Sequence, residues 1–274
     1  MQRHDTAQEP TTPKSPPLPK LDPSACKFCK RPSACPSCAH PLSPPAKSGP
    51  TNIDGDVPDP WGQLPPPLHD LERDSHADFL HCLPPTAPTF REFSVFAAGS
   101  IEMGAAIQWQ PLLANYLCDL PLTLCNPRRG AWDQSITPSA KTAAFRTQVE
   151  WELDALTRVS VITFFFDHAT MSPVTMCELG LWAHSEKVVV CCDRRFWKSG
   201  NVELVCERYG VPLVDSFAEM VPLVKAKLRT KGMVVEGDEF LGMGEEEARE
   251  YCAERTPKRW GMEPDLGEMM GEKK

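Results

Sequence analysis

The feature that most constrains the fold is an almost continuous apolar run at residues 159–166, Val-Ser-Val-Ile-Thr-Phe-Phe-Phe. Its β-branched and aromatic side chains favour a strand. A strand with one face in water alternates apolar and polar residues, whereas a central strand of a parallel sheet is apolar on both faces because helices cover both. The run therefore predicts a parallel sheet between two layers of helices.

Shorter apolar runs lie before and after it, at residues 93–98, 122–125, 187–192 and 211–214. The segments between these runs repeat apolar residues at helical spacing, and Ser172-Pro173 is a typical helix start. Strand thus alternates with helix five times, which is typical of α/β domains. We predict a flavodoxin-like, open, mostly parallel five-stranded sheet of strand order 2-1-3-4-5, with helices on both faces.

Proline sets the limits of this domain. Twenty of the 29 prolines lie within residues 1–90, so regular helix or sheet is excluded over much of that stretch. We predict a disordered, proline-rich arm at residues 1–90, the α/β domain at residues 91–230, and an acidic C-terminal tail at residues 231–274.

The arm contains two paired cysteine motifs, Cys26-x2-Cys29 and Cys35-x2-Cys38. Four thiolates can bind Zn²⁺ tetrahedrally, although five residues between the pairs is short for a zinc ribbon. The alternative is an unstructured linker that contains cysteines. Any zinc here would be structural, and we expect no cofactor for catalysis.

Composition excludes several classes of protein. No run of 18 apolar residues is present, so no membrane span is expected. The N-terminus lacks the apolar core of a secretory signal, which favours a cytoplasmic protein with reduced cysteines. A net charge of −8 without a basic patch argues against binding to duplex nucleic acid.

In an open parallel sheet, ligands bind beyond the carboxyl ends of the strands. Glu178 lies in the second turn of the helix that begins there, where the positive helix N-terminus favours an ionised carboxylate. Such a group can attack an electron-poor sugar carbon, although a glutamate on a helix is more often simply solvated. Gly99-Ser100 after the first strand can approach a sugar or phosphate, or can be a plain turn.

Four segments together resemble the nucleoside 2-deoxyribosyltransferase-like family over about residues 93–229. They are Phe96-Ala-Ala-Gly-Ser-Ile-Glu-Met-Gly104, Asn126-Pro-Arg-Arg129 with Trp132-Asp133, Gln148-Val-Glu-Trp-Glu152, and Ser172-Pro-Val-Thr-Met-Cys-Glu-Leu-Gly180. The resemblance implies cleavage of the N-glycosidic bond of a nucleoside through a covalent glycosyl–glutamate.

By position, the resemblance makes Glu178 the nucleophile and Glu152 the acid that protonates the base. It makes Gly99 and Ser100 part of the sugar site, and Asn201 a residue that often reaches the sugar of a neighbouring subunit, which leaves a homo-oligomer open. The substrate-binding set that we predict is Gly99, Ser100, Asn126, Arg128, Trp132, Asp133, Ser172 and Asn201.

One feature departs from the characterised transferases, and a second widens the choice of substrate. Those enzymes carry an aspartate six residues before the nucleophile, where this chain has Ser172, so base recognition is weakened or changed. Arg128 and Arg129 form a guanidinium pair that suits a 5′-phosphate and favours a nucleotide N-glycosidase, or are surface residues in salt bridges.

Three functions therefore stay open. The first is a transferase or hydrolase that acts on nucleosides or nucleotides. The second is an NAD glycohydrolase similar to TIR domains, which also use one glutamate on a helix. The third is a non-catalytic binding module that recruits a partner through the arm.

Overall fold

The computed structural model describes residues 57–65, 75–129, 138–234 and 243–258. Cys26, Cys29, Cys35 and Cys38 lie outside these residues, as do Trp132 and Asp133. Within the described part of the chain, no helix combines the length and the apolarity needed to cross a bilayer.

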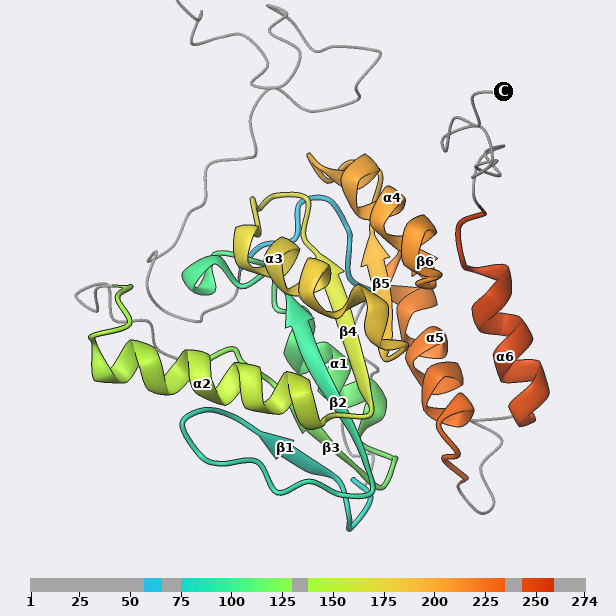
Figure 1. The fold of residues 1–274 in the computed structure, drawn as a ribbon, viewed down its shortest axis with the longest axis horizontal. Coiled ribbons are helices and arrows are strands. Elements are labelled where there is room, and N and C mark those ends of the chain that lie inside the picture. Colours follow the sequence, from blue (N-terminus) through green and yellow to red (C-terminus); the bar gives the residue numbers. More distant parts are fainter. Residues whose placement is uncertain (1–56, 66–74, 130–137, 235–242, 259–274) are drawn as a thin grey trace, which may run out of the picture. The chain divides into compact units, whose positions relative to one another are not determined.

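Six parallel strands form one open sheet, with helices on both faces (Figure 1). The strands are β1 (Leu80–Cys82), β2 (Phe93–Gly99), β3 (Leu122–Cys125), β4 (Val161–Phe166), β5 (Val188–Cys192) and β6 (Leu213–Val214), in the order β1-β3-β2-β4-β5-β6. The last five strands follow the predicted order 2-1-3-4-5, so the fold class is confirmed.

The prediction of five strands is wrong by one, because β1 adds to the sheet edge beside β3. It lies within residues 1–90 and has only three residues, with prolines soon after it. Its ladder pairs Cys82 with Cys125, and the main-chain N–H of Asn126 donates to the carbonyl of Cys82 at 2.9 Å. A strand this short carries no periodicity, so only its pairing reveals it.

The side chains of each central strand alternate between two hydrophobic clusters, one on each face of the sheet. Val95 and Ala97 of β2 pack with α1 (Trp109–Leu117) and α5 (Phe217–Thr230), and α6 (Glu245–Glu254) adds Ala248 and Cys252 to this cluster. Phe96 and Ala98 pack on the other face with α2 (Ala143–Arg158), α3 (Pro173–Trp182) and α4 (Ser199–Tyr209). Figure 1 shows α2 and α3 in front of the strands.

The orientation of α2 differs from the apolar stripe that the sequence shows. The spacing of Phe145, Val149, Leu153 and Leu156 predicts that these residues face the core, but Leu153 is 45% exposed. The buried residues are Gln148, Trp151, Ala155 and Leu156. Trp151 packs near Phe96 and donates from Nε1 to the carbonyl of Thr86 at 2.7 Å, which turns the helix toward this larger side chain.

Loops connect the strands to the helices at the carboxyl edge of the sheet. The loop after β2 contains a 3₁₀ turn (Glu102–Gly104) and leads to α1, which begins at Trp109. A second 3₁₀ turn (Ala183–Ser185) follows α3. The carboxyl ends of β2 and β4 are adjacent, so the loops that follow these two strands meet.

Gly99 ends β2 with a φ of +151°, and its place in the sheet leaves no room for a side chain. A Cβ atom there would lie 2.5 Å from the carbonyl oxygen of Phe165 and 2.6 Å from the indole of Trp109. We expect Gly99→Ala to lower the free energy of unfolding by about 3 kcal/mol, because backbone and a buried ring would both have to shift. Chemical denaturation measures this change. Gly200→Ala in α4 is the matched control, because a Cβ there meets open space; equal losses in the two variants would contradict the expectation.

Candidate active site

The loops after β2, β3 and β4, together with α2 and α3, enclose a cavity of about 410 Å³ at the carboxyl edge of the sheet. Pockets of this size accommodate small organic ligands. The residues that line it are Gly99, Ile101, Glu102, Met103, Pro127, Arg129, Phe145, Gln148, Val149, Glu152, Met171, Ser172, Pro173, Val174, Thr175 and Glu178.

Both predicted catalytic residues, Glu152 and Glu178, line this one cavity although they come from different helices. The side chains of both are half-buried. Burial, the larger cause, and the negative charge of Glu152 together raise the pKa of Glu178 to about 8. The structure therefore brings together two carboxyl groups, and the charge of Glu152 makes Glu178 harder to ionise.

Glu152 is held in a more polar setting than Glu178. Its Oε1 accepts a 2.6 Å hydrogen bond from Nε2 of Gln148, which also donates to the carbonyl of Pro127 at 3.1 Å. Burial raises the pKa of Glu152, whereas the Gln148 hydrogen bond and the charge of Arg129 oppose that shift. These two interactions favour the charged form of Glu152, whereas burial and the charge of Glu152 favour the protonated form of Glu178.

Three hydroxyl groups hydrogen-bond to one another at the turn that precedes the helix of Glu178, two from the turn itself and one from the loop after β2. Ser172 Oγ lies 2.5 Å from Ser100 Oγ and 2.7 Å from Thr170 Oγ1. Ser172 adopts a left-handed conformation with φ of 47°, directly before Pro173 starts α3. Ser172 thus lines the cavity while its hydroxyl bonds within the protein, and Ser100 is fully buried beneath it.

The two arginines that the sequence places side by side separate in the structure. Arg129 lines the cavity, but Arg128 is buried and donates to the carbonyls of Gly104, Ala106 and Ile107 and to Oε1 of Gln110. The guanidinium of Arg128 therefore holds the loop between β2 and α1. The two side chains do not form a joint phosphate site, and among the described lining residues Arg129 is the only basic one.

The remaining predicted residues lie outside the cavity lining. Asn126 is buried; its Oδ1 accepts from the main chain of Arg128 at 2.9 Å, and its Nδ2 lies 3.1 Å from Nε2 of His81. Asn201 is exposed on α4, and the resemblance assigns such a residue to the site of a neighbouring subunit. Among the described residues, no cluster of three or more His, Cys, Asp or Glu side chains is placed to hold a metal ion.

The cavity also contains residues that sequence reasoning did not select. Glu102 accepts from the main-chain N–H of Met171 at 3.2 Å, which joins the loop after β2 to the loop after β4. Gln148 lies one helical turn before Glu152, and this i, i+4 spacing in the sequence could have predicted that the two side chains meet. Phe145 and Val149 form part of the apolar wall of the cavity. Their helical spacing had suggested that they face the hydrophobic core instead.

The raised pKa of Glu178 makes a prediction about stability. Because the pKa of Glu178 in the folded protein lies above the ordinary value of 4.5, its contribution to folding is greatest at low pH and is lost as pH rises through about 8. We expect Glu178→Gln, which stays uncharged, to be more stable than the unsubstituted protein at about pH 8.5, with a smaller difference at about pH 5. Thermal unfolding at both pH values measures this. Glu246→Gln on the exposed face of α6 is the control; if both variants show the same pH dependence, the buried carboxyl pair is not its source.

Comparison with known proteins bears on the same segment. Residues 92–196 match the family model described as nucleoside 2-deoxyribosyltransferase like. The matched segment runs from the start of β2 to the loop after β5, so it includes every described residue that lines the cavity. No curated protein matches the chain. The match confirms the resemblance inferred from the sequence over residues 92–196, which are similar to the nucleoside 2-deoxyribosyltransferase-like family.

Proposed function

We propose that the protein cleaves the N-glycosidic bond of nucleosides, with Glu178 as the nucleophile and Glu152 as the acid. The observation that carries the proposal is the pair of carboxyl groups in one cavity of about 410 Å³, with the pKa of Glu178 raised to about 8 by burial and by Glu152. Perturbed carboxyl pairs of this kind are typical of sites that handle protons and glycosyl groups.

The chemistry follows from one proton shared by the pair. As the bond between C1′ and the base nitrogen breaks, its electron pair goes to the base, and a proton from Glu152 neutralises that nitrogen. Positive charge develops on C1′ and the ring oxygen, and the carboxylate of Glu178 stabilises it and then forms a bond to C1′. Because the pKa of Glu178 is raised to about 8, the proton that this carboxyl favours must move to Glu152 or to the base before attack.

Water or a second base completes the reaction at the same carbon. Attack on C1′ releases the carboxylate of Glu178, and the proton of the attacking group returns to Glu152. Water gives the free sugar, whereas a base gives a new nucleoside. Both outcomes use the same two carboxyl groups, so the chemistry of the pair leaves hydrolase and transferase activities equally open.

The charge of the cavity favours an uncharged substrate. Three carboxyl groups, from Glu102, Glu152 and Glu178, face the cavity with the single guanidinium of Arg129 among the described lining residues. A 5′-phosphate would add negative charge to this set, and like charges at close range weaken binding. We therefore infer that nucleosides are better substrates than their 5′-monophosphates, the reverse of what an arginine pair would favour.

The central test replaces the nucleophile. We expect Glu178→Ala to release no base above the uncatalysed background from any nucleoside that the unsubstituted protein cleaves. Chromatography after incubation with deoxynucleosides, ribonucleosides, their 5′-monophosphates and NAD measures base release and separates free sugar from new nucleoside. Glu150→Ala, an exposed carboxylate on α2, is the matched control. Unchanged base release in Glu178→Ala would end the proposal.

The role of Glu152 has its own signature. We expect Glu152→Gln to lower kcat for ordinary nucleosides by about 10²- to 10⁴-fold, because the base would leave without a proton. A 2-deoxyriboside with a nitrophenol leaving group needs no such proton, so its release should fall much less. Steady-state rates on both substrates measure the difference. Equal losses on the two substrates would show that Glu152 does not act as the acid.

A further inference from the structure

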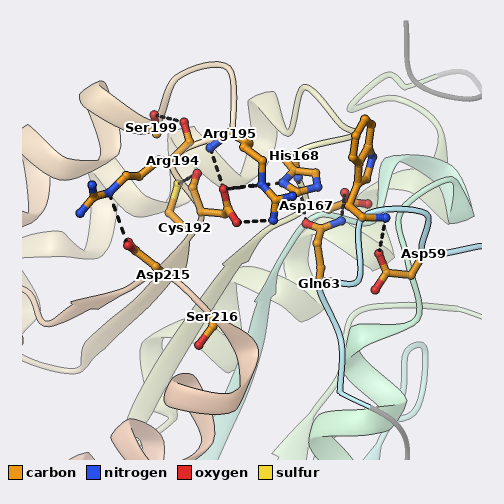
Figure 2. A network of polar contacts seen from close by, with 12 residues as sticks. Asp59, Gln63, Asp167, His168, Cys192, Arg194, Arg195, Ser199, Asp215 and Ser216 are labelled. Atoms are coloured by element: carbon orange, nitrogen blue, oxygen red, sulfur yellow. Dashed lines mark hydrogen bonds and ion pairs between the residues drawn. The ribbon is translucent and has the colours of Figure 1, made fainter. Parts of the chain in front are cut away.

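A short segment that precedes the matched residues, Asp59–Leu64, contacts the loop that leads into the helix of Glu178. We call this segment the strap. It is anchored to the domain by Leu64, which packs against the hydrophobic cluster of α1 and α5. Asp59 shapes the strap, because its carboxylate accepts from the main-chain N–H of Trp61 at 3.3 Å and of Leu64 at 2.8 Å. The turn that results directs Gln63 toward the end of β4 (Figure 2).

The side-chain amide of Gln63 hydrogen-bonds through both its nitrogen and its oxygen to two consecutive residues after β4. Nε2 of Gln63 donates to Oδ1 of Asp167 at 3.0 Å, and Oε1 accepts from the main-chain N–H of His168 at 3.2 Å. Trp61 lies edge-on to the ring of His168, with ring centroids 5.4 Å apart. The side chain of His168 is nearly inaccessible, so the strap closes this part of the loop from water.

Asp167 connects the Gln63 contact to the cavity. Oδ2 of Asp167 accepts from the main-chain N–H of Ile107 in the loop after β2, and its main-chain N–H donates to Ser100 Oγ at 2.8 Å. Ser100 Oγ in turn lies 2.5 Å from Oγ of Ser172, the residue that precedes α3. A continuous set of hydrogen bonds therefore runs from Gln63 to the start of the helix that carries Glu178.

We propose that Gln63 is a positioning residue for the glycosyl-transfer site, and that the strap forms a functional part of the domain although the family match does not include it. Its effect on rate rests on the proposed function. Gln63 acts through Asp167, His168 and the loop that they begin, and it sets where α3 starts. A loop displaced by about 1 Å can lower a rate by about 10²-fold, so a residue outside the cavity can act on kcat.

Two substitutions in the full chain separate positioning from general stability. Gln63→Leu keeps the volume and removes both hydrogen bonds. Gln63→Glu keeps the acceptor for His168 but places a carboxylate against Asp167. We expect Gln63→Leu to lower kcat for nucleoside cleavage by about 10- to 100-fold at every pH, with a smaller change in KM. Relative to the unsubstituted protein at the same pH, Gln63→Glu should show a similar loss near pH 8 and a smaller loss toward pH 5, where the introduced carboxyl becomes protonated and donates to Asp167.

Arg249→Gln on exposed α6 changes the net charge by the same single unit as Gln63→Glu and should leave the pH profile of kcat unaltered. Wild-type kcat in Gln63→Leu, or a pH profile of Gln63→Glu with no recovery at low pH, would overturn the positioning role.

Amide hydrogen exchange tests the same inference without any turnover. In Gln63→Leu we expect faster exchange at residues 168–175, beginning with the His168 amide that has lost its acceptor, and unchanged exchange in α6. Unchanged exchange at residues 168–175 would overturn the inference. If the unsubstituted protein cleaves no nucleoside, the proposed function fails, and the exchange result still decides whether Gln63 holds this loop.

Discussion

The buried carboxylate of Asp167 is the constraint on which the carboxyl edge of the sheet depends. It is fully buried, and N–H groups from Ile107, Ala169 and Gln63 donate to it. A buried carboxylate is strongly disfavoured unless such donors surround it, and hydrogen bonds to a charged acceptor are stronger than neutral ones. These contacts hold the loop after β2, the loop after β4 and the strap in one arrangement. The cavity lies between those two loops, so its shape depends on this interaction.

The cavity concentrates features that work against stability. Glu102, Met103 and Ser172 adopt left-handed conformations without being glycine, and all three line the cavity. Such conformations cost about 1–3 kcal/mol each and persist where the surrounding structure requires them. The carboxyl groups of Glu152 and Glu178 add mutual repulsion and desolvation. Local instability of this kind is common at sites selected for chemistry.

The sequence predicted β2 to β6 because each lies in an apolar run between segments of helical spacing, and their order 2-1-3-4-5 is that of a flavodoxin-like sheet. β1 was missed because its three residues, Leu-His-Cys, form no apolar run and lie in the proline-rich stretch of residues 1–90. The helix that carries Glu178 was predicted, and so was the partnership of Glu152, although the latter came from the family resemblance. Arg128 and Arg129 do not form one phosphate site, because the guanidinium of Arg128 turns toward the carbonyls of Gly104, Ala106 and Ile107. Two adjacent arginines in a sequence carry no information about the direction in which each side chain turns.

Periodicity and turn chemistry are local properties, so the sequence by itself determined the α/β class, the alternation of strands and helices, and the place of Glu178 after Ser172-Pro173. Contacts between distant residues were decided only by the tertiary structure. Gln63 and Asp167 are 104 positions apart, and Glu152 and Glu178 belong to different helices. Whether such side chains meet depends on how strands pair and how helices rotate on the sheet. No short segment encodes that geometry, because packing of the whole domain selects it.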